Sequence, residues 1–290
     1  MAFQKNKQLL LFFFIFCTVT LAKQRPSSYP FITGDTFRAF CDHMYDETTT
    51  ALPTHEIKYG QTIFVKGDML KQFFTHKHPH IKTNYILVTH NSANSVPGIF
   101  GNFLDDPKIL AWFGQNIDRN HPKLHAIPLG IENGHWPRGD ITVYETLKKK
   151  LPLQKNKMLY LNVNVKTNPK ERKPIIDFFK NSPFCYSSKN KTHKEFLEDL
   201  ATSFFVASPK GKGVDCHRTW ETLYCGSIPI VTHSSIDPLF AYLPVLIIDT
   251  WQQITQDYLE NMYIKMMDQS YRMEMLYADY WFEKIKSYIN

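Results

Sequence analysis

The sequence predicts an α/β protein with two lobes, a cleft between them and a helical C-terminal tail. The first observation is the pattern of residues 204–231, FFVASPKGKGVDCHRTWETLYCGSIPIV. An apolar run, a Gly- and Lys-rich loop, an amphipathic segment ending at Gly226 and a second apolar run predict two parallel strands joined by a helix. The second observation is size. The 290 residues, 43% of them hydrophobic, suffice for two lobes of ordinary domain size.

The first half of the chain supplies the N-terminal lobe, expected over residues 31–145. Residues 61–65, 85–89 and 124–128 are predicted strands, a short helix capped by Asp68 should run to residue 74, and residues 107–113 are expected to be helical. The His-rich stretch 75–80 is predicted to be an exposed loop. The strand 85–89 ends in His90-Asn91-Ser92, and polar residues at this position often contact ligands in α/β proteins.

The second half supplies the C-terminal lobe, expected over residues 152–290. Strands are predicted at 158–165, 204–207, 228–231 and 245–248, and helices at 169–180, 194–203 and 215–224. Residues 251–289 are helical in pattern and rich in Met and Tyr. This aromatic stripe is more typical of core packing than of a cofactor site.

The N-terminus has the features of a targeting segment. Lys5 and Lys7 precede an apolar stretch at 9–22, and the small residues Thr20 and Ala22 suit cleavage after Ala22, so residues 1–22 are predicted to be a signal peptide. A short signal anchor, which would add membrane association, is the alternative, although about 20 apolar residues are needed to cross a bilayer. The expected location is the secretory-pathway lumen (ER or Golgi) or an exported, periplasmic one.

Charge and cysteine content narrow the function further. The net charge is +7, but Lys and Arg are scattered and form no basic stripe with aromatics, which argues against nucleic-acid binding. After removal of the signal, Cys41, Cys185, Cys216 and Cys225 remain, and an exported chain predicts disulfides with three possible pairings. A direct bond between Cys216 and Cys225 is disfavoured because the intervening helix would hold them about 13 Å apart. No CxxC or HExxH spacing indicates zinc.

The segment 215–226 carries the strongest chemical signal. Asp215, Arg218 and Glu221 are three apart and share one helix face. They could be ordinary surface ion pairs, but they follow a Gly-Lys-Gly loop at the carboxyl end of a strand, where backbone N–H groups bind anions. A guanidinium there can hold a diphosphate through paired hydrogen bonds, and a carboxylate one turn later can accept from ribose hydroxyls.

This stretch resembles the donor-binding motif of exostosin-like glycosyltransferases, in which an Arg and a Glu on such a helix precede a Gly-x-Ile/Val-Pro-Val strand. The fucosyltransferase families have a similar segment. Residues 85–97, 127–136 and 158–168 fit the family loosely and in the expected order. The resemblance implies a GT-B-like architecture of two Rossmann-like lobes, in which the C-terminal lobe binds the nucleotide sugar and the N-terminal lobe faces the acceptor. Such enzymes are usually metal-independent, and the chain has no Asp-x-Asp motif.

The resemblance also implies roles for residues of this chain. Arg218 would neutralise the departing diphosphate, Glu221 would bind the ribose, and His217 would either touch the diphosphate or cap the helix. The implied substrate-binding residues are Lys210, Gly211, Lys212, Gly213, Asp215, His217, Arg218 and Glu221. An inverting reaction needs a base on the acceptor side, for which His90 and Glu132 are candidates because both follow strands of the first lobe. A retaining reaction would need none.

The leading hypothesis is a glycosyltransferase that moves a sugar from a nucleoside diphosphate to a glycan or glycoconjugate. The alternative is a non-catalytic relative that kept the donor fold and binds a nucleotide or glycan. The loop 209–213 lacks the Gly-x-x-x-x-Gly-Lys-Ser/Thr pattern, and no Gly-x-Ser-x-Gly elbow occurs, which argues against a P-loop enzyme or a common serine hydrolase. The first lobe is short for a GT-B enzyme.

Overall fold

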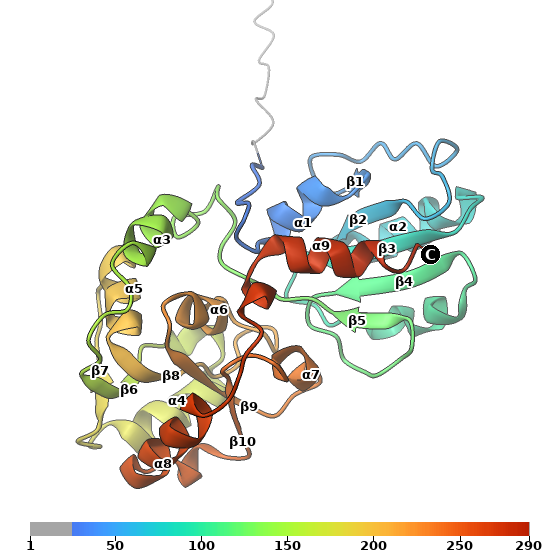
Figure 1. The fold of residues 1–290 in the computed structure, drawn as a ribbon. Coiled ribbons are helices and arrows are strands. Elements are labelled where there is room, and N and C mark those ends of the chain that lie inside the picture. Colours follow the sequence, from blue (N-terminus) through green and yellow to red (C-terminus); the bar gives the residue numbers. More distant parts are fainter. Residues whose placement is uncertain (1–24, 290) are drawn as a thin grey trace, which may run out of the picture.

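The computed structural model describes residues 25–289, and the expected signal peptide lies outside this range. The predicted α/β class with two lobes is confirmed: the chain forms two five-stranded parallel sheets with helices around them (Figure 1). Parallel pairing requires a crossover between successive strands, and helical segments lie in most of these connections. None of the helices in the described range is long and apolar enough to cross a bilayer.

The N-terminal sheet contains its strands in chain order. These are β1 (His43–Tyr45), β2 (Thr62–Lys66), β3 (Tyr85–His90), β4 (Ile109–Gly114) and β5 (Leu124–Ala126). The central strand β3 is buried along its whole length, as expected for a parallel strand covered on both faces. The flanking helical segments are α1 (Gly34–Phe40), η1 (Gly67–Met69), α2 (Leu70–His76), η2 (His78–His80) and η3 (Gly98–Asp105).

In the C-terminal sheet the spatial order of the strands differs from their order along the chain. Its strands are β6 (Lys157–Leu161), β7 (Cys185–Ser187), β8 (Ser203–Ala207), β9 (Ile228–Thr232) and β10 (Leu246–Ile248), paired in the order β10-β9-β8-β6-β7. From β6 the chain first moves to β7 on one side and then to β8 on the other. The point between β6 and β8 is therefore a topological switch point, where open α/β sheets bind ligands.

Helices cover this sheet and complete the tail. They are η4 (Val165–Thr167), α4 (Pro169–Phe179), α5 (His193–Ala201), α6 (His217–Tyr224), α7 (Asp237–Phe240), η5 (Trp251–Gln253), α8 (Gln256–Met267), η6 (Met273–Leu276) and α9 (Ala278–Lys286). The pattern of residues 204–231 forms the predicted unit: β8 pairs in parallel with β9, and α6 connects them. Gly226 ends the helix in the left-handed conformation, with φ of 71°.

Two helices pack across the expected lobe boundaries. Helix α3 (Ile141–Lys148) precedes the second sheet but contacts α5, and α9 returns from the tail to α1 of the first lobe (Figure 1). The rings of Phe40 and Phe282 stack there with centroids 4.0 Å apart. The two sheets fall within residues 31–145 and 152–290, but α3 packs on the C-terminal lobe and α9 packs on the N-terminal lobe.

One large core cluster joins the lobes. It contains the interior of the first sheet, including Phe64 and Trp112, together with Trp220 and Leu223 of α6 and Trp281 of α9. A second cluster lies within the C-terminal lobe around β6, β8, β9 and α8. The lobes therefore share the buried apolar surface of the first cluster, and the C-terminal lobe also has a core of its own.

Some sequence-based expectations were wrong. Residues 109–114 form the buried strand β4, because ILAWFG fills the centre of a sheet covered on both faces. Asp68 caps no helix and instead accepts hydrogen bonds from Ser92 and Asn94. In the His-rich stretch, His78 is buried between Tyr85 and Asp106.

The expected disulfides are absent from residues 25–289. Cys41, Cys185, Cys216 and Cys225 all carry free thiols. Cys41 follows α1 in the first lobe and Cys185 lies on the edge strand β7, while Cys216 and Cys225 flank α6 at its opposite ends. The helix separates the last two, as the sequence indicated.

Candidate anion site at the amino end of helix α6

The Gly- and Lys-rich loop follows β8, so it lies at the switch point between β6 and β8. The loop is held by Arg172 of α4, a buried residue that is 5% exposed. Its guanidinium donates to the carbonyl oxygens of Lys210 (Nε, 3.0 Å), Pro209 (Nη2, 3.4 Å) and Asn164 (Nη1, 3.0 Å). A side chain from the strand β6 side of the switch point thus fixes the loop that follows β8.

The predicted loop residues differ in their surroundings. Lys210 donates from Nζ to the carbonyl oxygen of His233 (2.8 Å), and the side chain of Lys212 is exposed. Gly211 is buried, and its N–H donates to the carbonyl oxygen of Gly213 (3.1 Å). At Gly213 a Cβ would collide with the side-chain amide of Asn116 in the N-terminal lobe, so the backbone must come this close without a side chain.

Helix α6 begins directly after this loop with its N–H groups uncapped by any side chain. Its N-cap is Cys216, whose side chain makes no capping hydrogen bond. Thr219, Trp220 and Leu223 form the buried face that anchors the helix. His217 and Arg218 occupy the first turn, where the helix dipole favours a bound anion.

Arg218 lacks partners for part of its guanidinium. Its Nε and Nη1 are buried and donate no hydrogen bond within the described residues. Burial is the largest influence on the Arg218 pKa and lowers it; the nearby Arg172 and Arg138 lower it further, whereas Cys216 and Glu221 act in the opposite direction. A partly exposed guanidinium beside two other cations, with two buried unpaired donors, is suited to binding an anion.

Glu221 lies one turn further along α6 and is 3% exposed. Its Oε1 accepts a hydrogen bond from the Tyr144 hydroxyl of α3 (3.3 Å) and lies 3.7 Å from Nε2 of His193 at the start of α5. Burial by itself would raise the Glu221 pKa, but His193, His217 and Arg218 outweigh it, so the pKa is lowered and the carboxylate is charged.

Asp215 joins the two lobes. Its carboxylate accepts hydrogen bonds from the backbone N–H groups of Leu129 (2.8 Å) and Cys216 (2.7 Å) and from Trp220 Nε1 (2.9 Å). Its own N–H donates to Asn116 Oδ1 (3.1 Å). Burial raises the Asp215 pKa to about 6 against the opposing effect of these hydrogen bonds. Protein donors therefore occupy the oxygens that the sequence assigned to substrate.

His217 also reaches the N-terminal lobe. Its Nδ1 lies 2.8 Å from the carbonyl oxygen of Gly130. Because a carbonyl oxygen only accepts, Nδ1 carries the proton and the ring does not cap α6. Of the two roles expected for His217, capping is excluded and contact with a ligand is left open.

His90, the first predicted base, has both ring nitrogens engaged by protein groups, which disfavours that role. Its Nε2 donates to the carbonyl oxygen of Pro128 (3.1 Å) and its Nδ1 accepts from the N–H of Asn91 (2.7 Å). Burial lowers its pKa to about 4. Both ring nitrogens are occupied in the neutral form, so His90 is a structural histidine of the lobe junction.

Glu132, the second predicted base, lies on the segment after Gly130. It is partly exposed, and its Oε2 accepts a weak hydrogen bond from the N–H of Arg138 (3.4 Å). Its charge acts on Tyr144, which contacts Glu221. Glu132 is therefore near the carboxylate end of the site, and its role as a base stays a prediction.

The structure thus brings the loop, His217, Arg218 and Glu221 to one place, with Glu132 near its edge. Sequence reasoning missed the residues that surround them: Arg172, Tyr144, His193 and Arg138. Arg138 lies over the ring of Phe196 (5.3 Å) and adds positive charge beside Arg218. Among these, only the N-cap signal Thr192, with Glu195 at the third position, marked His193 as the start of a helix.

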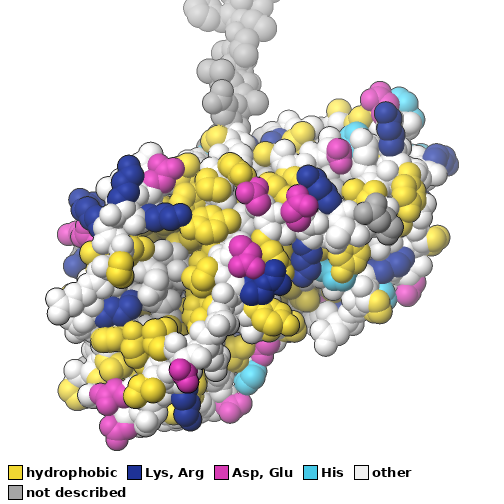
Figure 2. Space-filling view, in the orientation of Figure 1, with side chains coloured by type: hydrophobic (Ala, Val, Ile, Leu, Met, Phe, Trp, Pro, Cys, Tyr) yellow, Lys and Arg dark blue, Asp and Glu magenta, His cyan; other side chains and the backbone are white. Residues whose placement is uncertain are grey.

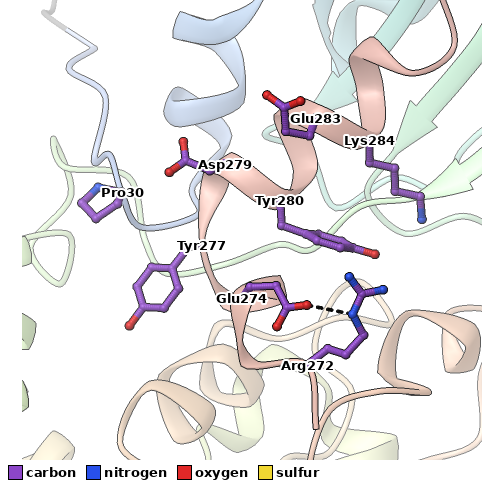
Figure 3. Close-up of a pocket in the computed structure, with 8 residues that line it drawn as sticks. All are labelled: Pro30, Arg272, Glu274, Tyr277, Asp279, Tyr280, Glu283 and Lys284. Atoms are coloured by element: carbon purple, nitrogen blue, oxygen red, sulfur yellow. Dashed lines mark hydrogen bonds and ion pairs between the residues drawn. The ribbon is translucent and has the colours of Figure 1, made fainter.

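A hollow of about 640 Å³ lies elsewhere, along η6 and α9 (Figure 3). Its polar groups are paired: Arg272 donates to Glu274 (2.8 Å) and lies over the Tyr280 ring, and Asp279 accepts from the Tyr29 hydroxyl (3.0 Å). The face that carries it mixes Lys and Arg with Asp and Glu (Figure 2). A smaller hollow of about 150 Å³ lies between α3 and α5. Unlike Arg218, none of the residues that line the hollow at α9 has a buried donor without a hydrogen-bond partner.

Within residues 25–289, no group of three or more His, Cys, Asp or Glu side chains is arranged to hold a metal ion.

Comparisons with known proteins give a distant structural likeness. No family model matches the sequence, and no curated protein matches it. Among solved structures, the catalytic domain of starch synthase IV from Arabidopsis thaliana, bound to ADP and acarbose, is matched with a TM-score of 0.31 and 11% identity, over 80% of this chain and 69% of that one. At this level the likeness carries no functional conclusion for the chain.

Proposed function

We propose that this protein is a glycosyltransferase that takes a sugar from a nucleoside diphosphate and passes it to a glycan or glycoconjugate. The observation that carries the proposal is Arg218, a partly buried residue whose guanidinium has two buried, unpartnered nitrogens, at the amino end of α6 and beside a glycine loop at the switch point. The position of Arg218 suits binding of an anionic group that is part of the substrate.

A diphosphate fits this position better than a carboxylate or a single phosphate. The loop backbone, the first turn of α6 and Arg218 can contact oxygens on more than one phosphoryl group. The charged Glu221 lies one turn away, where an acceptor for hydroxyl groups suits a ribose. Leaving-group stabilisation by fixed positive charge is the chemistry that a departing diphosphate needs.

The proposal also includes the metal dependence of the site and the location of the protein. Arg218, with Arg138 and Arg172 nearby, supplies positive charge at the site, so we expect nucleotide binding without a divalent metal. We also expect entry into a secretory or exported compartment through residues 1–22. The resemblance to exostosin-like enzymes supports both expectations. A nucleotide- or glycan-binding relative without turnover is the alternative, since binding would conserve the same donor site.

The test is a thermal-shift screen of residues 23–290 against UDP, GDP, CMP and their sugars, without metal and then with Mn²⁺. A ligand at 100-fold over its Kd should add about 2.7 kcal/mol to the free energy of unfolding. Arg218→Ala should weaken nucleoside diphosphate binding by about 1.5–3 kcal/mol, because a charged hydrogen-bonding group is lost.

The same variant distinguishes a binding role from a structural one. Removing a buried charge that has unpaired donors should leave the melting temperature of the free protein unchanged or raised. Arg119→Ala, at a half-exposed arginine paired with Asp118, is the matched control and should bind as the parent does. Arg218→Ala protein that melts lower yet binds every nucleotide normally would contradict the proposal. A nucleotide shift without transfer to any acceptor would favour the binding relative.

A further inference from the structure

His217 has one ring nitrogen that is committed and one that is free. Its Nδ1–H donates to the Gly130 carbonyl oxygen, which fixes the neutral tautomer with the lone pair on Nε2. Across residues 25–289 this Nε2 makes no hydrogen bond, and it is not among the enclosed polar atoms that lack a partner. The lone pair is therefore accessible from the surface of a partly buried ring.

The position of His217 connects the two lobes. The residue precedes Arg218 in the first turn of α6, while the carbonyl that orients its ring belongs to the segment after β5 in the N-terminal lobe. It thus lies between the proposed diphosphate position and the lobe expected to face the acceptor. His90, which is adjacent on β3, is occupied at both nitrogens and cannot serve in its place.

We propose that His217 is the catalytic base of an inverting sugar transfer, an inference that rests on the proposed function and names the residue that activates the acceptor. In the step, Nε2 takes the proton of an acceptor hydroxyl while the hydroxyl oxygen bonds to the anomeric carbon of the donor. The bond from that carbon to the diphosphate oxygen breaks on the opposite face, and its electron pair leaves with the diphosphate, which Arg218 stabilises. A histidine oriented by a backbone carbonyl suits general-base catalysis.

The charged or titratable groups near the ring come from three elements. His90 of β3, Asp215 before α6 and Glu221 on α6 interact electrostatically with His217. Arg218 follows it directly on α6, and Glu132 lies on the segment after Gly130. Glu132 is the competing base, so its variant is compared directly with that of His217.

The experiment compares parent, His217→Gln, Glu132→Gln and His55→Gln proteins. Gln keeps an N–H able to donate to Gly130, so the lobe contact and fold are preserved, which the melting temperature checks. His55 is 82% exposed in a turn of the first lobe and provides the matched control. Release of UDP or GDP is followed from UDP-glucose, UDP-galactose, UDP-N-acetylglucosamine and GDP-fucose with a mixture of oligosaccharide acceptors, and the Kd for UDP and GDP is measured separately.

For His217→Gln we expect a loss of about 10²–10⁴-fold in kcat with little change in nucleotide Kd. The ascending limb of the pH–rate profile should vanish, imidazole should partly restore a His217→Ala protein, and the product of the parent should have inverted anomeric configuration by NMR. His55→Gln should behave as the parent in all of these measurements.

Other outcomes overturn the inference in distinguishable ways. A weaker nucleotide Kd with unchanged kcat would make His217 a diphosphate ligand, and loss of the ascending limb only in Glu132→Gln would assign the base to Glu132. A retained anomeric configuration, or nucleotide binding by the parent without transfer, would remove the need for this base while leaving the donor site intact. If the parent binds no nucleotide, the proposed function fails and this inference fails with it.

Discussion

At the scale of single residues, buried charges fall into two groups. Arg172 and Asp215 have their hydrogen-bonding capacity met by protein groups, on the loop and between the lobes. Arg218, which is partly buried, does not, because its Nε and Nη1 have no partner within the described residues. Since burying an unpaired donor is costly, the first two arrangements stabilise the fold, whereas the third suits the ligand proposed above.

The raised pKa of Asp215 predicts that the stability of the fold depends on pH. Its pKa is about 6 in the folded protein against about 3.9 for a free Asp, so the folded state holds the proton more tightly. This contribution to stability is fully present below about pH 4 and is lost as the pH rises through about 6. Relative to Asp215→Asn, the parent should lose about 2–3 kcal/mol of unfolding free energy between pH 4 and pH 7.

Urea unfolding of both proteins at several pH values measures this difference. Asp46 and Asp106, whose pKa values are lowered, are present in both proteins, so their effects cancel when the two stability curves are subtracted. The pH dependence of the difference is therefore due to Asp215. Parallel stability curves for parent and variant would show that Asp215 keeps an ordinary pKa in the fold.

At the scale of elements, the conformation of the Gly- and Lys-rich loop after β8 depends on a helix that follows a different strand. Helix α4 comes after β6, and its Arg172 binds three carbonyl oxygens of the two loops that meet at the switch point. Asn168, the N-cap of α4, donates to the Gly211 carbonyl oxygen (2.9 Å) as well. The conformation of the glycine loop is therefore imposed by its neighbour and does not come from its own sequence.

Arg172→Met tests this dependence. The methionine would keep much of the side-chain volume but leave the carbonyl groups of Asn164, Pro209 and Lys210 without donors, so the free energy of unfolding should fall by about 2–4 kcal/mol. Nucleotide binding should weaken although Arg172 does not donate to the ligand.

The matched control is Arg272→Met, at a half-exposed arginine whose partner Glu274 is also exposed. Loss of that surface pair should change stability by no more than about 1 kcal/mol. Equal effects of the two substitutions, by chemical denaturation, would mean that Arg172 does not hold the loop.

At the scale of the whole molecule, the lobes are joined by shared core and exchanged helices. Trp220 and Leu223 of the C-terminal lobe lie in the same cluster as the first sheet, and α9 seals that cluster with Trp281, which is 1% exposed. The indole Nε1 donates to the Met275 carbonyl oxygen (2.9 Å), which holds α9 to η6. Lobes connected in this way should not unfold independently.

Calorimetry should therefore show a single unfolding transition for residues 23–290, with equal calorimetric and van't Hoff enthalpies. Trp281→Ala should lower the free energy of unfolding by about 3–5 kcal/mol through the cavity it creates, and should move the whole transition to lower temperature. Trp281→Phe, a milder change, gives the same readout if the alanine variant does not fold. Two separated transitions in the parent, or a shift confined to one of them, would contradict a shared core.

Local sequence patterns were sufficient to predict several elements of this protein. The βαβ unit of residues 204–231, the strand 85–89 and the helical tail have strong periodicity and clear boundaries such as Gly226, so local physics suffices. The same patterns indicated the α/β class and placed Arg218 and Glu221 on one helix. They failed for residues 109–114, because a short apolar run does not distinguish a buried strand from a helix without its neighbours.

Long-range packing, in contrast, sets which residues surround the site and which of their polar atoms have no protein partner. Arg172, Tyr144 and His193 come from α4, α3 and α5, at sequence distances that no periodicity relates to α6. Strand order created the switch point between β6 and β8. Long-range hydrogen bonds occupied His90 and Asp215 but left Arg218 and Nε2 of His217 open, because a donor or acceptor is satisfied by whatever the fold brings within about 3 Å.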